Sequence, residues 1–297
     1  MASHSSRLFQ VAFCLALPCL ASCGPAFQLA TTSNSPVKEA RLPPGAVVLD
    51  IYSIRFPFGD EEVNGSLWRE IDEQHLPPEL RRKLACNGFR VGLVGGQIPE
   101  TLSRLMELKD KPAPNSEANT VNVSDMEAAS RVMWSHQQLS PGKPGKIAVS
   151  QQYERLALLL NESGEVGGRS YAKAQGILTV RSTPLPDGRV RLEIVPELEY
   201  GEFRRQMGVS QGHWEIMKMA KDRRTFDCLT VSVTLNPGEM IVFSGLPSLR
   251  GSLGDYFFTG DTSGALEQRL LVIRLSQTQH NAPFDMPEVL PLDELDE

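Results

Sequence analysis

The sequence predicts a β-rich α+β protein, in which a small N-terminal α+β unit is followed by an antiparallel β-domain. Apolar and polar residues alternate strictly over Arg189–Ile194 and again over Leu229–Leu235. This period of two places one face of each strand in a core. Glycine- and proline-containing turns separate the strands, and the strongest helical spacing precedes residue 109. The three observations favour an antiparallel sheet with one buried face and few helices.

The overall composition fits a folded soluble protein. The 297 residues can bury the core of one large domain or of two small ones. The net charge is −6 and the basic residues are scattered, which gives no support to a nucleic-acid partner. The body of the chain contains two cysteines, Cys86 and Cys228, which either pair in an oxidising compartment or remain separate buried thiols.

Residues 1–22 have the organisation of a bacterial signal peptide. Arg7 supplies a positive charge, and the apolar run over 8–20 is too short for a comfortable transmembrane helix. Leu20-Ala21-Ser22-Cys23 resembles the lipobox of bacterial lipoproteins, which implies that Cys23 is lipidated and anchors the chain to a membrane. The alternative is an ordinary secretory signal followed by a chance cysteine. Gly24 implies, by the same resemblance, an outer-membrane protein that faces the periplasm.

After the anchor, residues 23–44 are rich in Ser, Thr, Pro and Ala and predict a flexible tether. The small α+β unit spans residues 45–108. Its first strand has apolar residues on both faces, which is typical of a central strand covered on both sides. Proline near the start and Asn-Gly at the end delimit the first helix. The expected elements alternate between strand and helix: Ala46–Phe56, Leu76–Cys86, Phe89–Val94 and Ile98–Leu108.

Residues 109–145 predict a linker that contains a short helix. Two prolines and many polar residues open this segment, and Ser124 with Glu127 could form a capping box for a helix over Asp125–Trp134. The β-domain then spans residues 146–278. Its core-facing residues on the alternating strands are Val190, Leu192, Ile194, Leu229, Val231 and Val233. Its turns are predicted at Asp187-Gly188 and Pro237-Gly238, where proline fixes φ and glycine permits a positive φ.

Three segments of the C-terminal half do not follow the alternation. Glu202–Asp227 is locally basic and predicts a solvated loop or a short helix. Phe257-Phe258 lies in a glycine-rich stretch and is either a membrane-facing tip or a plug of the core. Residues 279–297 contain six acidic residues and three prolines but no Lys or Arg, a composition that predicts a disordered tail.

Three motifs in the β-domain resemble the C-terminal domain of bacterial secretins, from type II and type III secretion systems. They are DGRVRLEIVPEL, starting at Asp187, LTVSVTLNPGEMIVFSGL over Leu229–Leu246, and RLLVIRLS over Arg269–Ser276. Their order and spacing match that domain over about a third of the chain. The resemblance implies a secretin-like β-domain and a structural role in a protein secretion or outer-membrane assembly, with other copies of the chain or a secretion-system component as partners.

No catalytic or metal-binding motif emerges from the sequence. Gly168–Ala172 lacks the second glycine of a nucleophile elbow, and Gly92–Gly96 lacks the lysine of a phosphate-binding loop. We therefore expect no enzymatic activity, no cofactor and no metal. Two main hypotheses remain: a secretin-like structural protein of the cell envelope, and a monomeric lipoprotein whose sheet binds a protein or an envelope polymer. A lipid-tethered hydrolase is the third.

Overall fold

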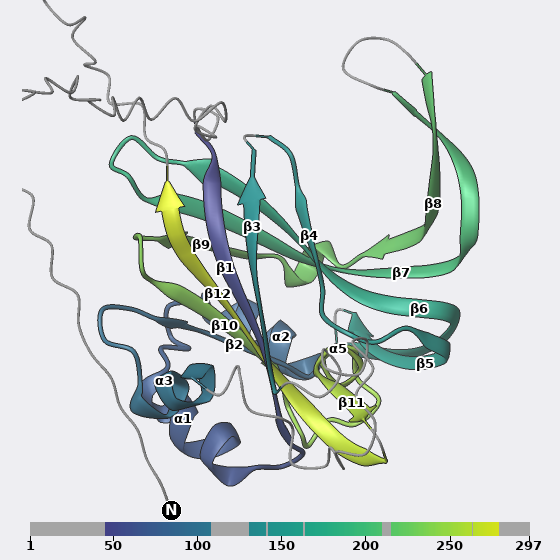
Figure 1. The fold of residues 1–297 in the computed structure, drawn as a ribbon. Coiled ribbons are helices and arrows are strands. Elements are labelled where there is room, and N and C mark those ends of the chain that lie inside the picture. The colour runs from purple at the N-terminus through teal and green to yellow at the C-terminus, as the bar shows by residue number, and fades with distance from the viewer. Residues whose placement is uncertain are drawn as a thin grey trace, which may run out of the picture. The chain divides into compact units, whose positions relative to one another are not determined.

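Two antiparallel sheets and a few short helices form the described part of the chain (Figure 1). The structure is a computed structural model and describes residues 45–107, 131–140, 142–162, 164–209, 215–262 and 264–278. The predicted signal segment 1–22, Cys23 and the predicted tether up to residue 44 lie outside these ranges, as does the acidic segment 279–297. The predicted β-rich α+β fold class is confirmed.

The first sheet combines strands from both ends of the chain. Its order is β2-β10-β12-β1-β3, and β11 also pairs with β12. All of its pairings are antiparallel. The strands are β1 (Val47–Pro57), β2 (Phe89–Val94), β3 (Val132–Leu139), β10 (Met240–Gly245), β11 (Thr259–Thr262) and β12 (Ala265–Thr278).

The second sheet is built around two strands of 20 residues each. The order β4-β6-β7-β8 forms its main path, while β5 pairs with β6 and β9 pairs with β7. The strands are β4 (Gly145–Ala148), β5 (Tyr153–Glu162), β6 (Glu165–Pro184), β7 (Val190–Val209), β8 (Glu215–Thr225) and β9 (Val231–Leu235).

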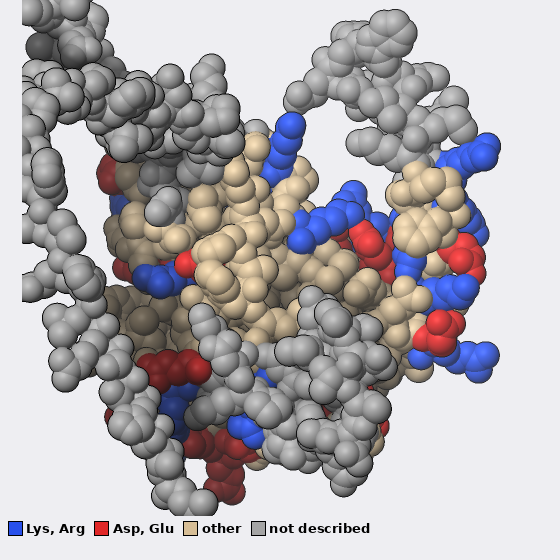
Figure 2. Space-filling model, viewed as in Figure 1, with Lys and Arg blue, Asp and Glu red and all other residues tan. Residues whose placement is uncertain are grey.

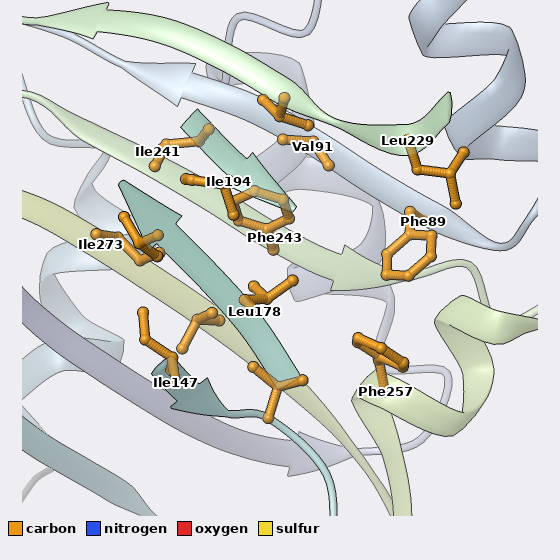
Figure 3. Close-up of a cluster of buried hydrophobic side chains, with 14 of the residues drawn as sticks. Phe89, Val91, Ile147, Leu178, Ile194, Leu229, Ile241, Phe243, Phe257 and Ile273 are labelled. Carbon is orange, nitrogen blue, oxygen red and sulfur yellow. The ribbon is translucent and has the colours of Figure 1, made fainter. Parts of the chain in front are cut away.

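The main core lies between the two sheets. Figure 3 shows side chains of both sheets pointing toward one another, with Ile241, Phe243 and Ile273 from the first sheet and Leu178 and Ile194 from the second. Burial of this much aliphatic and aromatic surface, at about 25 cal/mol per Å², is the main force that holds the sheets together. The sequence alternation of period two therefore becomes a two-sheet sandwich.

The opposite face of the first sheet is covered by helices. Leu67 and Trp68 of α1 (Leu67–Glu70) and Leu102 of α3 (Glu100–Glu107) pack there against Met240 and Val242 of β10. The π-helical turn η1 (Glu62–Ser66) leads into α1. Because the first sheet is covered on both faces, its central strands are apolar on both sides, as predicted for β1.

Two further helices close an end of the inter-sheet core. Leu84 of α2 (Pro78–Cys86) belongs to that core, and α2 contacts the 3-10 turn η3 (Asp227–Leu229). Phe257 and Phe258 of α5 (Leu253–Phe258) are also buried in it and pack edge-on against Phe89. Of the two alternatives for the paired phenylalanines, the structure therefore supports the core plug.

Three predictions of local structure are wrong. The helix predicted over Asp125–Trp134 is contradicted at its end, where Val132–Trp134 pair with β1 at the edge of the first sheet; residues 125–130 lie outside the described ranges. The segment Glu202–Asp227 is no loop, because β7 extends to Val209 and β8 pairs back along it. The two cysteines are exposed and unpaired, so they are not buried thiols.

The predicted division into an N-terminal unit and a β-domain does not coincide with a division between sheets. β1 pairs with β12 over its whole length and β2 pairs with β10, so residues 45–108 contribute to a sheet completed by residues 240–278. The nearby helices cover one face of β1, but the residues that cover its other face come from the second sheet, far along the chain. Part of the predicted linker 109–145 also belongs to this sheet, as β3.

Candidate functional site: a projecting β-ribbon

The second sheet divides into two hairpins at one position. β6 and β7 pair from Pro184↔Val190 as far as Gln175↔Glu199, and there the ladder between them ends. Beyond it β6 pairs with β5, and β7 pairs with β8 as far as Val209↔Glu215. We call Tyr200–Val209 of β7 with Glu215–Asp222 of β8 the projecting ribbon; in Figure 1 it curves away from the two sheets.

The division is marked by an irregular backbone in both long strands. Lys173 of β6 has φ = 49°, a left-handed conformation that is uncommon for a residue with a side chain. On β7 the register shifts between Tyr200 and Arg204, and Gly201 has φ = 78°. Lys173 and Glu202 form an ion pair across the gap, and their hydrogen bond lowers the pKa of Glu202 and raises that of Lys173. These irregularities turn each strand away from the other.

The hairpin of β5 and β6 folds back onto the body of the protein. Leu156, Leu158 and Leu160 of β5 are buried in the inter-sheet core. The Tyr153 hydroxyl lies within hydrogen-bonding distance of the Tyr256 and Thr259 carbonyl oxygens, at 3.0 and 2.9 Å. Burial raises the pKa of Tyr153 to about 12. This hairpin therefore belongs to the folded core.

The projecting ribbon has no such cover. Phe203 is 61% exposed and Met219 is 60% exposed, although both belong to strands. Within the described residues, the outer edges of β7 beyond Tyr200 and of β8 pair with no other strand. Open edges beside exposed apolar side chains are the features that allow a strand of another chain to add to a sheet.

Basic residues are concentrated on this part of the molecule. Residues 200–225 contain six Lys or Arg and three acidic residues, whereas the whole chain has a net charge of −6. Figure 2 shows blue side chains along the side where β6, β7 and β8 lie, with red ones among them. Some charges are balanced locally, since Arg204 pairs with Asp222 and Arg224 with Glu162. The ribbon itself contains four Lys or Arg and three acidic residues, so its net charge is +1 in a chain whose net charge is −6.

The residues that the sequence assigned to the sheet and its turns have structural positions. Val190, Leu192, Ile194 and Val231 are fully buried in the inter-sheet core, as is Leu229, which lies in η3 and precedes the strand. Val233 is 3% exposed. Asp187 accepts hydrogen bonds from the backbone and side chain of Arg189. The φ angles of Gly188 and Gly238 are 83° and 93°. Pro237 lies in the β9–β10 turn.

A second feature is a groove of about 370 Å³ between the edge strands β3 and β4. Ile51, Ile147 and Leu271 line its floor, and Met133 and Trp134 stand at its rim with large exposed surfaces. The imidazole of His136, also on the rim, contacts the carboxylate of the buried Asp50. Among the residues that the structure describes, no three His, Cys, Asp or Glu side chains are grouped as a metal site would require.

Sequence reasoning missed the residues that distinguish the ribbon. Phe203 and Met219 occur in a basic segment, and basic residues are typical of solvated loops. Phe203 and Ile216, among these charges, are residues whose types are enriched in strands, which is a weak signal. The pairing of Arg205 with Met219 shows that the segment is a hairpin, which no local pattern specifies.

No helix in the described part of the chain has the length and apolarity needed to cross a membrane.

Comparison with known proteins adds little to this geometry. No family model matches the sequence, and no curated protein matches it. Among solved structures, the chain is similar to the InvG secretin domain β-barrel from the Salmonella SPI-1 injectisome NC-base, with a TM-score of 0.22 and 9% identity. The match covers 80% of this chain but 61% of that one. Because the TM-score is so low, the secretin resemblance continues to depend on the sequence motifs.

Proposed function

We propose that this chain is a lipid-anchored structural protein of the bacterial cell envelope, and that its projecting ribbon binds another protein by strand pairing. The observation that carries the proposal is the ribbon itself, with two open edges and the exposed Phe203 and Met219. Main-chain hydrogen bonds at an open edge supply affinity, and the side chains beside it supply selectivity. The lipid anchor at Cys23 and the outer-membrane location rest on the signal sequence.

Two kinds of partner are consistent with this proposal. In the first, the partner is another copy of this chain or a secretin, so that the protein is part of a secretion or outer-membrane assembly, as the sequence motifs suggest. In the second, the protein is a monomeric lipoprotein that binds a different protein. The second is favoured by the inter-sheet core, because the apolar faces carrying Leu192 and Val231 are already covered within one chain.

Membrane fractionation followed by sizing tests the proposal. Wild type should fractionate with membranes, and Cys23→Ala should be released into the soluble fraction. After detergent extraction, a ring-sized species supports the first kind of partner and a monomer supports the second. Retention of Cys23→Ala in the membrane would contradict the lipid anchor.

The ribbon is tested separately from the anchor. Phe203→Lys with Met219→Lys should remove the larger species or the co-purified partner, because edge lysines oppose strand addition. The matched control is Val166→Lys with Leu159→Lys, which changes two exposed apolar side chains of the β5–β6 hairpin. Equal behaviour of the two double variants would contradict a role for the ribbon in binding.

A further inference from the structure

One face of the projecting ribbon combines apolar and basic side chains. Arg205 and Met219 are direct cross-strand partners, and such partners lie on the same face of a sheet. Lys221 follows Met219 by two residues in β8 and so shares that face. The Lys221 ammonium lies 5.4 Å from the centre of the Phe203 ring, which places Phe203 beside it. We call these four residues the ribbon face.

Among the described residues, the two basic side chains of the ribbon face form no ion pair with an acidic residue. Arg205 is exposed, and its side chain makes no ion pair among the described residues. The Lys221 ammonium donates hydrogen bonds to the Gln152 side-chain oxygen at 2.9 Å and to the Lys173 carbonyl oxygen at 3.3 Å. Both of these acceptors are neutral, although the Glu202 carboxylate lies close enough to interact electrostatically with Lys221. The face therefore suits an occupant that carries carboxylates next to apolar side chains.

The C-terminal segment 279–297 has this chemistry. It contains six acidic residues and no Lys or Arg, and its apolar residues include Phe284, Met286 and Leu290. Phe284 and Met286 are two residues apart, with Asp285 between them. In an extended chain the two apolar side chains would share one face. The segment thus offers both kinds of contact that the ribbon face requires.

The acidic segment can reach the ribbon from the point where it leaves the first sheet. Thr278 pairs with Val47, and Val47 pairs with Leu139 on the next strand. Adjacent strands lie about 4.8 Å apart. The Leu139 side chain packs against Gly145, and the next residue, Lys146, reaches Glu199 at the base of the ribbon through a 2.5 Å ion pair.

These steps place Thr278 on the order of 30 Å from the base of the ribbon, and 19 residues can span on the order of 60 Å. The geometry and charge together point to an intramolecular contact, and we propose that the acidic segment 279–297 binds the ribbon face of its own chain. This inference goes beyond the proposed function and requires neither the lipid anchor nor a partner. It concerns the face of the ribbon and leaves the strand edges open.

Hydrogen–deuterium exchange of the full-length chain tests the contact. The variant Asp285→Asn, Glu288→Gln and Asp293→Asn removes three charges from the segment. In this variant the amides of Tyr200–Val209 and Glu215–Asp222 should exchange roughly tenfold faster than in wild type, because each of the three lost ion pairs should contribute a factor of about two. Salt at 1 M should have a similar effect on wild type. The control Glu61→Gln, Glu70→Gln and Glu79→Gln removes three exposed charges elsewhere and should leave these amides unchanged.

Zero-length carbodiimide cross-linking provides the second measurement. In wild-type monomer, a carboxylate of the segment should couple to Lys221, and the three-residue variant should show less product. Equal exchange in wild type and variant, with no such cross-link, would overturn the proposal. Cross-links only between isotopically distinct chains would show that a second copy is the occupant. Protection of the ribbon amides only after addition of phosphatidylglycerol vesicles would show that a lipid surface is the occupant. Either of these two results would also overturn the proposal.

Discussion

The two halves of β7 belong to one continuous strand but have opposite environments. Val190–Glu199 pairs with β6 on one side and with β9 and then β8 on the other, and its Val190, Leu192 and Ile194 are fully buried. From Tyr200 onward the same strand pairs only with β8, and its Phe203 is 61% exposed. The first half builds the core, whereas the second half extends beyond it.

This difference separates strand formation from burial. Both halves satisfy their backbone hydrogen bonds through antiparallel pairing, so both are strands. Only the first half has a second sheet opposite its apolar face. An apolar side chain such as Leu192 therefore contributes to stability in the first half, whereas Phe203 in the second half is exposed, which is the physical basis of the binding role that we propose.

The largest expected effect comes from truncating a side chain in the buried half. Leu192→Ala should lower the free energy of unfolding by about 2–5 kcal/mol, because it removes buried apolar surface and leaves a cavity between the sheets. Phe203→Ala, on the same strand, should change it by less than about 0.5 kcal/mol. Equilibrium denaturation in urea measures both. Similar losses for the two variants would break the comparison and show that the ribbon is packed.

A pH titration sharpens the contrast for the hairpin that folds back. Burial raises the pKa of Tyr153 to about 12, so the folded state keeps this proton above pH 10 while the unfolded state loses it. Stability should therefore fall as the pH rises from 10 toward 12, by up to about 3 kcal/mol from this group.

Tyr153→Phe is the control for this titration. The variant loses the hydroxyl and should be less stable at neutral pH, but its stability should depend less on pH between 10 and 12. Thermal unfolding at several pH values compares the two proteins. An unchanged slope in the variant would show that Tyr153 does not couple folding to pH in this range.

The smallest expected effect concerns the point where the two halves meet. Gly201→Ala should reduce stability by about 1 kcal/mol, because φ = 78° is unfavourable for a residue with a Cβ atom. Gly167→Ala in β6 is the control, since its added Cβ would meet no atom within 4 Å, and its effect should be within about 0.5 kcal/mol. Denaturation curves that do not distinguish the two variants would remove the backbone argument for the turn at Gly201.

Much of the local structure follows from the sequence. Alternation identified the buried faces of β7 and β9, and Pro77-Pro78 and Asn87-Gly88 predicted the limits of α2 to within two residues. Turn chemistry also located the glycines at positions 188 and 238, where φ is positive. These features were predictable because each depends on neighbouring residues, through strand periodicity or the φ angles that proline and glycine allow.

The arrangement of the elements was decided by the tertiary structure. β1 pairs with β12 across more than 200 residues of sequence, and the β6–β7 ladder ends at Gln175↔Glu199 although both strands continue. Strand partners are selected by long-range pairing and shared burial, which a local pattern does not encode. The sequence by itself therefore determined which residues of the alternating segments form strands and face a core. Only the packing of the two sheets decided that the basic segment becomes an exposed ribbon, because exposure depends on whether another layer covers it.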